Sequence, residues 1–175
     1  MTIMTPDSLT PENQMPVKLD PGDVCIAASY ATGTPDIRRN SGEGRVLVYD
    51  ENFNLKGALW TGRTGLVLGL AYCPLARELY VSDSSAKSID RFSCAGELLF
   101  PHPDQQGKPF GTMACAHSGG LVTGEHIKGD KFPFIGGGEI YAFNQNGTQT
   151  GVYACERDPG KFGFHGVTSL VLENE

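Results

Sequence analysis

The chain has 175 residues, of which 39% are hydrophobic, so it is long enough to bury the core of one ordinary domain. Its formal net charge is −6 and its 14 lysines and arginines are scattered along the chain, which excludes the basic stripe of a nucleic-acid-binding surface. The 23 glycines and the scarcity of helical periodicity predict many short strands.

Residues 1–20 contain proline, threonine and asparagine, without a basic start or an apolar run of seven residues. They are therefore neither a signal peptide nor a membrane span, and we expect a mobile tail and a protein that does not enter a membrane. The five cysteines are an odd number without a C-x-x-C pair. This favours buried thiols in a cytoplasmic protein over disulfides.

The first predicted strands are Val24–Ala28 and Val46–Tyr49, joined by a long loop over residues 29–44. The second strand is apolar without alternation, so we expect both of its faces to be covered.

Two later stretches repeat one pattern at matched offsets. Gly69 precedes Asp83 by fourteen residues, Gly111 precedes Glu125 by fourteen, and an apolar strand begins ten residues after each glycine. Each copy continues to a strand that ends on an aromatic residue and a polar turn, such as Asn146-Gly147, which predicts a type I′ hairpin. Four strands are predicted in the second copy, at Leu66–Tyr72, Glu78–Ser82, Ser88–Phe92 and Glu97–Pro101.

Four-stranded antiparallel units of about forty residues that pack face to face are the blades of a β-propeller. We therefore predict an all-β fold with a mobile tail over 1–20 and a three-blade propeller segment over 21–175. A β-sandwich is the alternative all-β fold.

The stretch from Gly65 to Ser84, with Ala86–Phe92, resembles one blade of the six-bladed propellers of the NHL-repeat and gluconolactonase-like superfamily. Gly44–Asp50 followed by Leu55–Gly57 is similar to the outer strands of an NHL repeat. The resemblance covers about residues 22–172, and it implies that this chain supplies half of a six-bladed ring.

Three blades are too few to close a ring. The first unit lacks its inner strand, and the last predicted strand, Val167–Leu172, has no blade of its own. Two interpretations follow: the chain is the front half of a longer protein, or two copies form a homodimer in which the last strand of each completes the first blade of the other.

In a propeller, the loops that join the second strand of each blade to the third all lie on one face. The two long loops, about residues 29–44 and 126–138, are loops of this kind, as is the short turn Ser84–Lys87. The connections between blades, which we expect at Thr61–Thr64, His102–Lys108 and Glu156–Phe164, open on the same face. We expect a small molecule or a protein to bind at this long-loop face.

The same face gathers the candidate metal ligands Asp83, Glu125, His126 and His165. Two carboxylates and one or two imidazoles around one axis suit Ca²⁺ through oxygen ligands, or Mn²⁺ or Zn²⁺ through mixed ligands. The resemblance implies metal binding and base catalysis for Asp83, as in gluconolactonases. However, Leu68 stands where that family has an asparagine. We therefore expect a binding module, with a metal-dependent hydrolase or lactonase as the alternative.

Overall fold

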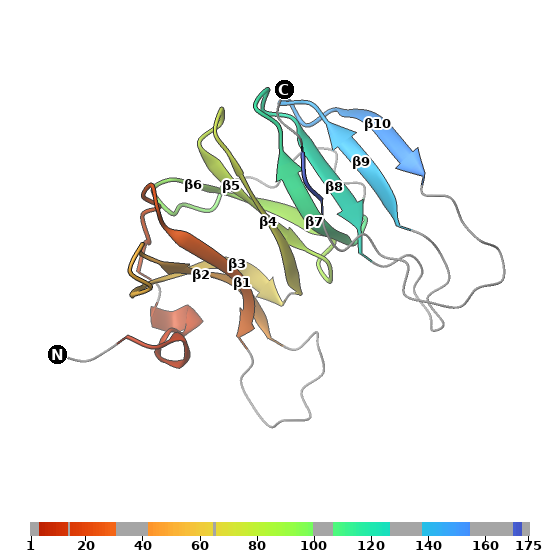
Figure 1. The fold of residues 1–175 in the computed structure, drawn as a ribbon. Coiled ribbons are helices and arrows are strands. Elements are labelled where there is room, and N and C mark those ends of the chain that lie inside the picture. The colour runs from red at the N-terminus through yellow and green to blue at the C-terminus, as the bar shows by residue number, and fades with distance from the viewer. Residues whose placement is uncertain are drawn as a thin grey trace.

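The computed structural model describes residues 4–13, 15–30, 42–64, 66–99, 107–126, 138–154 and 170–172. Within them, ten strands form three antiparallel sheets that lie side by side in chain order (Figure 1). The sheets are β1 (Val24–Tyr30), β2 (Glu43–Tyr49) and β3 (Leu55–Thr64); β4 (Val67–Cys73), β5 (Glu78–Asp83) and β6 (Ser88–Ser93); and β7 (Phe110–Cys115), β8 (Leu121–Glu125), β9 (Glu139–Phe143) and β10 (Gln149–Ala154). This arrangement confirms the predicted all-β fold of successive antiparallel units.

Two boundaries differ from the prediction. β3 continues to Thr64, so Thr61–Thr64 belongs to a strand rather than to a connection between blades. In the second sheet, the described part of Glu97–Pro101 pairs with β6 through an isolated bridge between Phe92 and Leu98 and two backbone hydrogen bonds but forms no regular strand, and Leu98 is 46% exposed. The sequence has prolines at 101 and 103, and proline has no N–H group for a ladder, so a regular fourth strand is disfavoured there.

Apolar side chains fill both interfaces between neighbouring sheets. The first interface packs Val46, Val48 and Leu59 against Val67, Leu79, Val81 and Phe92. The second packs Ala71, Cys73, Tyr80 and Ile89 against Phe110, Met113, Leu121, Tyr141 and Phe143. β5 thus sends Leu79 and Val81 to one side and Tyr80 to the other, because both faces of its sheet are covered. Burial on both faces explains why its residues are apolar without alternation.

The repeated glycines allow the first strands of the second and third sheets, β4 and β7, to approach closely. A Cβ atom at Gly69 would lie only 1.9 Å from the carbonyl oxygen of Gly111. The Ser82 hydroxyl occupies the space beside them, donating to that oxygen at 2.6 Å and accepting from the Gly69 N–H at 2.9 Å. The matched glycine offset in the sequence therefore reflects a contact between backbones.

The hairpins that follow β2, β6 and β9 contain turns with the same hydrogen-bond pattern. Side-chain oxygens of Asp50, Ser93 and Asn144 each accept two backbone N–H groups from the residues that follow. The predicted type I′ turn at Asn146-Gly147 is wrong, because only Gly147 has a positive φ, of 82°. A type I′ turn needs positive φ at both central residues, whereas one left-handed glycine after a type I turn gives a three-residue loop.

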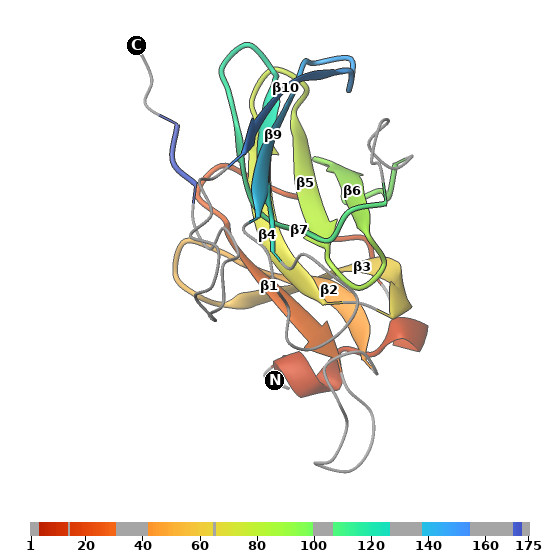
Figure 2. The same ribbon diagram turned by 90° about the vertical axis from the view of Figure 1, so that its right-hand side faces the viewer.

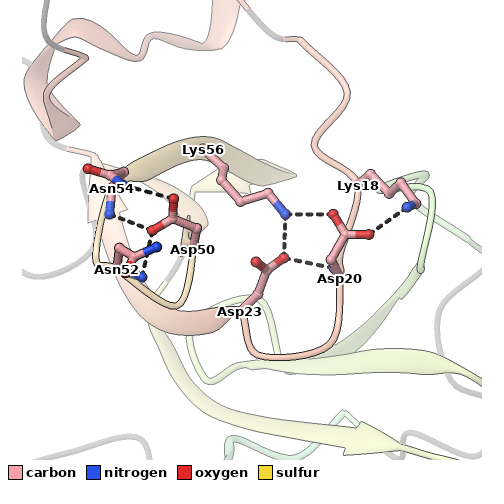
Figure 3. Close-up of polar contacts among 7 residues, drawn as sticks. All are labelled: Lys18, Asp20, Asp23, Asp50, Asn52, Asn54 and Lys56. Atoms are coloured by element: carbon pink, nitrogen blue, oxygen red, sulfur yellow. Dashed lines mark hydrogen bonds and ion pairs between the residues drawn. The ribbon is translucent and has the colours of Figure 1, made fainter.

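The N-terminal segment lies against the first two sheets. Val17 is only 5% exposed and joins the apolar cluster of their interface, and the Leu19 N–H donates to the Cys94 carbonyl at 2.8 Å. Lys56 reaches from β3 to the carboxylates of Asp20 and Asp23, at 3.0 and 2.6 Å (Figure 3). The described part of residues 1–20 therefore has defined contacts, and the mobility expected for this segment stays a prediction.

Farther towards the N-terminus, the short helices η1 (Pro6–Ser8) and η2 (Pro11–Asn13) lie beside the first sheet (Figure 2). Leu9, between them, packs on the sheet face that carries Trp60. Arg45 donates to the carbonyl oxygens of Pro6 and Leu9 at 2.9 and 3.2 Å. These contacts cover the face of the first sheet that points away from the second.

β1 is the edge of the first sheet in the described part of the chain, which agrees with the predicted lack of an inner strand. Of the predicted last strand Val167–Leu172, residues 170–172 are described and are not in a strand, and the rest lies outside the described residues. A strand that pairs with β1 from a second copy stays a prediction. None of the helices in the described ranges has the length and hydropathy of a membrane span.

Candidate functional site

Asp83 ends β5 at the long-loop end of the second sheet, and its side chain is completely buried. One carboxylate oxygen, Oδ1, accepts three backbone N–H groups, from Leu66 at 3.0 Å, Ser85 at 3.0 Å and Ala86 at 2.9 Å. These bonds fix the turn before β6 and tie it to the start of β4. The other oxygen, Oδ2, has no hydrogen-bond partner among the described residues.

The unpartnered oxygen of Asp83 points across the interface to the first sheet. A Cβ atom at Gly44 would lie 3.3 Å from Oδ2 of Asp83 and 2.7 Å from the Thr61 hydroxyl. That hydroxyl donates to the Gly44 carbonyl at 3.1 Å. Gly44 therefore leaves space beside the carboxylate that a side chain would fill.

A second buried carboxylate, Asp90 on β6, lies in the same interface. Nη2 of Arg63, on β3, donates to its Oδ1 at 2.7 Å, while its Oδ2 has no hydrogen-bond partner in the described part of the chain. The Asp90 side chain is fully buried, whereas that of Arg63 is 37% exposed. The ion pair thus connects the first two sheets from the rim of the interface.

Burial raises the pKa of Asp90 above its ordinary value, the Arg63 guanidinium opposes that shift, and the Asp83 carboxylate adds to it. The nearby Ser88 hydroxyl lowers the pKa of Asp90 least of these groups, and Ser88 Oγ has no hydrogen-bond partner among the described residues. The Arg63 guanidinium pairs with Asp90, and the described partners of Asp83 are backbone N–H groups, which carry no full positive charge. Such an excess of buried negative charge is costly unless a proton or a cation neutralises it.

Glu125, at the matching position in the third sheet, is also buried but has partners for both oxygens. Lys108 lies 3.7 Å from Oε1, and the Glu139 N–H donates to Oε2 at 3.3 Å. The same ammonium sits 4.7 Å from the centre of the Tyr141 ring. Glu125 is thus held by its own sheet, and no described contact joins it to Asp83.

His126 directly follows Glu125 at the end of β8. Its backbone N–H donates to the Pro109 carbonyl at 2.9 Å, and its side chain packs against Gly111. His165 and most of both long loops lie outside the described residues. The four-residue metal site therefore stays a prediction. In the described ranges, no three His, Cys, Asp or Glu side chains form a group that could hold a metal.

No protein-family model matches the chain, and no curated protein matches its sequence. Among solved structures, a luciferin-regenerating enzyme is similar over 87% of this chain, with a TM-score of 0.56 and 14% identity. The β-propeller domain of Cps50 (Swd1) from Myceliophteria thermophila is similar over 78% of this chain and 42% of its own, with a TM-score of 0.43 and 10% identity. The fold is propeller-like. The chain spans about half the length, 47%, of the luciferin-regenerating enzyme.

Sequence reasoning found Asp83 but missed Asp90 and Arg63. A signal for Asp90 was present, since a charged residue inside a strand that is covered on both faces must be buried and needs a partner. The identity of that partner was not readable, because Arg63 lies 27 residues away on another sheet.

Proposed function

We propose that the chain is a propeller-type binding module that holds a divalent cation between Asp83 and Asp90, at the long-loop end of the first two sheets. Through that cation it presents a site for a small molecule or a protein. The observation that carries the proposal is the pair of fully buried carboxylates, each with one oxygen that lacks a partner among the described residues.

The donors present favour a hard cation. Two carboxylate oxygens, with hydroxyl, backbone and water oxygens to complete the shell, suit Ca²⁺ or Mn²⁺. Zn²⁺ prefers nitrogen and sulfur ligands, whereas the two side chains that carry this proposal are both carboxylates. We therefore rank Ca²⁺ and Mn²⁺ above Zn²⁺.

A metal-dependent hydrolase of the gluconolactonase type is the second candidate. Asp83 stands where the resemblance implies the metal ligand and base, and its Oδ2 has no described partner. Against this role, Oδ1 is already occupied by three backbone N–H groups, and Leu68 replaces the expected asparagine. The test of this candidate is cation-dependent opening of a sugar lactone that Asp83→Asn abolishes.

The binding proposal predicts that the melting temperature rises with Ca²⁺ or Mn²⁺. A ligand at a hundred times its Kd adds about 2.7 kcal/mol to the free energy of unfolding. Asp83→Asn and Asp90→Asn keep the shape of the side chain but remove its charge, so each variant is expected to lose most of this response. Differential scanning calorimetry at pH 7 with and without each cation measures it.

Asp50→Asn is the matched control, because Asp50 is a half-buried turn carboxylate in the hairpin between β2 and β3 whose oxygens have described partners. It is expected to keep the full response. Glu125→Gln and His165→Ala test the four-residue site instead, since losing the response in these variants alone would move the cation away from Asp90. A wild-type melting temperature that no cation changes would contradict the proposal.

A further inference from the structure

A cavity of about 470 Å³ lies at the opposite end of the first two sheets from Asp83. The N-terminal segment closes one side of it, and the other walls come from the start of β1, from β4, from the hairpin before β5 and from the turn after β6. Leu19, Leu70 and Leu79 make its walls largely apolar. Its volume is that of a typical small-molecule site.

The carboxylates of the cavity wall are neutralised from within the protein. Lys56 pairs with both Asp20 and Asp23, and Lys18 pairs with Asp20 (Figure 3). Burial, followed by the Asp23 carboxylate, raises the pKa of the Cys25 thiol, so this wall residue stays neutral. This side of the cavity therefore offers no strong attraction to a cation.

Arg77 supplies the positive charge of the opposite wall. No carboxylate among the described residues forms an ion pair with it, and the adjacent Glu78 is already bound by Arg91 at 2.7 and 2.8 Å. Beside it, the Tyr72 hydroxyl contacts the Cys94 sulfur at 3.8 Å. The Cys94 thiol raises the pKa of Tyr72, an effect that Arg77 opposes more weakly, so the phenol remains a donor at neutral pH.

The backbone places Arg77 at this wall in an unfavourable conformation. Its φ is +56°, in the left-handed region that glycine adopts at least cost. The corresponding hairpin between β7 and β8 has Gly119 in that conformation, with a φ of +82°. The chain thus carries a long cationic side chain at a turn position where glycine would be less strained.

We propose that this cavity binds a small molecule with an apolar body and one anionic group, a carboxylate, sulfonate or phosphate. The apolar body lies against the three leucines, and the anionic group accepts hydrogen bonds from Arg77 and Tyr72. This site is separate from the cation site of the proposed function and does not depend on it.

The test uses 8-anilinonaphthalene-1-sulfonate as the probe and follows its fluorescence during titration of the full chain. We expect saturable binding of one probe per chain. Arg77→Gly relaxes the turn, so its melting temperature is expected to be unchanged or higher, while its affinity for the probe falls about tenfold or more. Lys87→Gly is the matched control, because Lys87 is also cationic with a φ of +54° but lies in the turn at the other end of the sheet.

Two further measurements sharpen the result. The uncharged analogue N-phenyl-1-naphthylamine is expected to bind more weakly than the sulfonate and to be insensitive to Arg77→Gly. Bound sulfonate is expected to slow alkylation of Cys94, which lines the cavity, but not that of Cys115, which does not. Wild-type affinity for the sulfonate in Arg77→Gly, an equal loss in Lys87→Gly, or equal protection of both thiols would overturn the proposal.

Discussion

The two interfaces between neighbouring sheets both contain buried residues but differ in what fills them. Between the second and third sheets, polar groups are satisfied: Ser82 bonds to both Gly69 and Gly111, and the rest is aromatic and aliphatic packing. Between the first and second sheets, Asp83 and Asp90 each keep an oxygen that no described residue binds. Buried polar groups without partners cost stability. The interface between the second and third sheets avoids this cost, whereas the interface between the first and second sheets keeps two carboxylates that packing alone does not require.

Replacing one glycine in each interface gives the largest expected contrast. At Gly69 the new Cβ atom would meet a backbone oxygen at 1.9 Å, which can move only with its strand. At Gly44 it would meet side-chain atoms, Thr61 Oγ1 at 2.7 Å and Val67 Cγ2 at 2.8 Å, and these β-branched side chains are stiff but can shift more readily than a backbone oxygen held in a strand. We therefore expect Gly69→Ala to cost about 3 kcal/mol or more and Gly44→Ala about 1–2 kcal/mol. Urea unfolding measures both.

If the two alanine variants lose the same free energy of unfolding, the two interfaces do not differ in rigidity. The cation response adds a second readout, because a Cβ atom at Gly44 enters the space beside Asp83 Oδ2. Gly44→Ala is expected to weaken that response, whereas Gly69→Ala, if folded, is expected to keep it.

The pH dependence of stability gives a smaller contrast. The pKa of Asp90 is raised in the folded state from 3.8, so the folded chain binds the proton more tightly than the unfolded chain. As the pH rises from 3.8 through the folded pKa, Asp90 loses its proton and the free energy of unfolding falls. Asp90→Asn removes this loss, so the free energy of unfolding of the variant is expected to rise relative to that of the wild type as the pH increases. Urea midpoints between pH 4 and pH 8 measure the difference.

Asp50 is the control with the opposite sign. Its hydrogen bonds with Asn54 lower its pKa from 3.8, so its contribution to stability is present above pH 3.8 and is lost as the pH falls through the folded pKa. Asp50→Asn is therefore expected to be less stable than the wild type by a constant amount well above pH 4, and this difference is expected to shrink as the pH falls through the folded pKa of Asp50. If the difference in urea midpoint between wild type and Asp90→Asn does not change with pH, the pKa of Asp90 is not raised in the folded state.

Much of the fold was readable because the repeat encodes backbone geometry. The fourteen-residue offset from Gly69 to Asp83 and from Gly111 to Glu125 predicted both the strand order and the equivalent strand ends. The repeat did not indicate how each acid is partnered. Lys108 and the Glu139 N–H, which hold Glu125, and Arg63, which holds Asp90, come from other strands at variable separations.

The cavity near Arg77 was not predictable for a related reason. One of its walls is the segment Leu19–Asp23, and the composition of residues 1–20 suggested a tail rather than a wall. In the described part of that stretch Val17 is the one buried apolar residue, and it fits because Gly57 on β3 and Gly96 in the turn after β6 have no side chains. Isolated apolar residues in a polar segment do not indicate which surface they contact.

Direct cation binding tests the central claim that the first interface holds a functional site. In a titration of Mn²⁺ followed by the electron paramagnetic resonance signal of the free ion, the wild type is expected to remove one ion per chain at pH 7. Asp83→Asn and Asp90→Asn are each expected to weaken this uptake about tenfold or more, and Asp50→Asn to match the wild type. No uptake by the wild type, or equal uptake by all four proteins, would contradict the account.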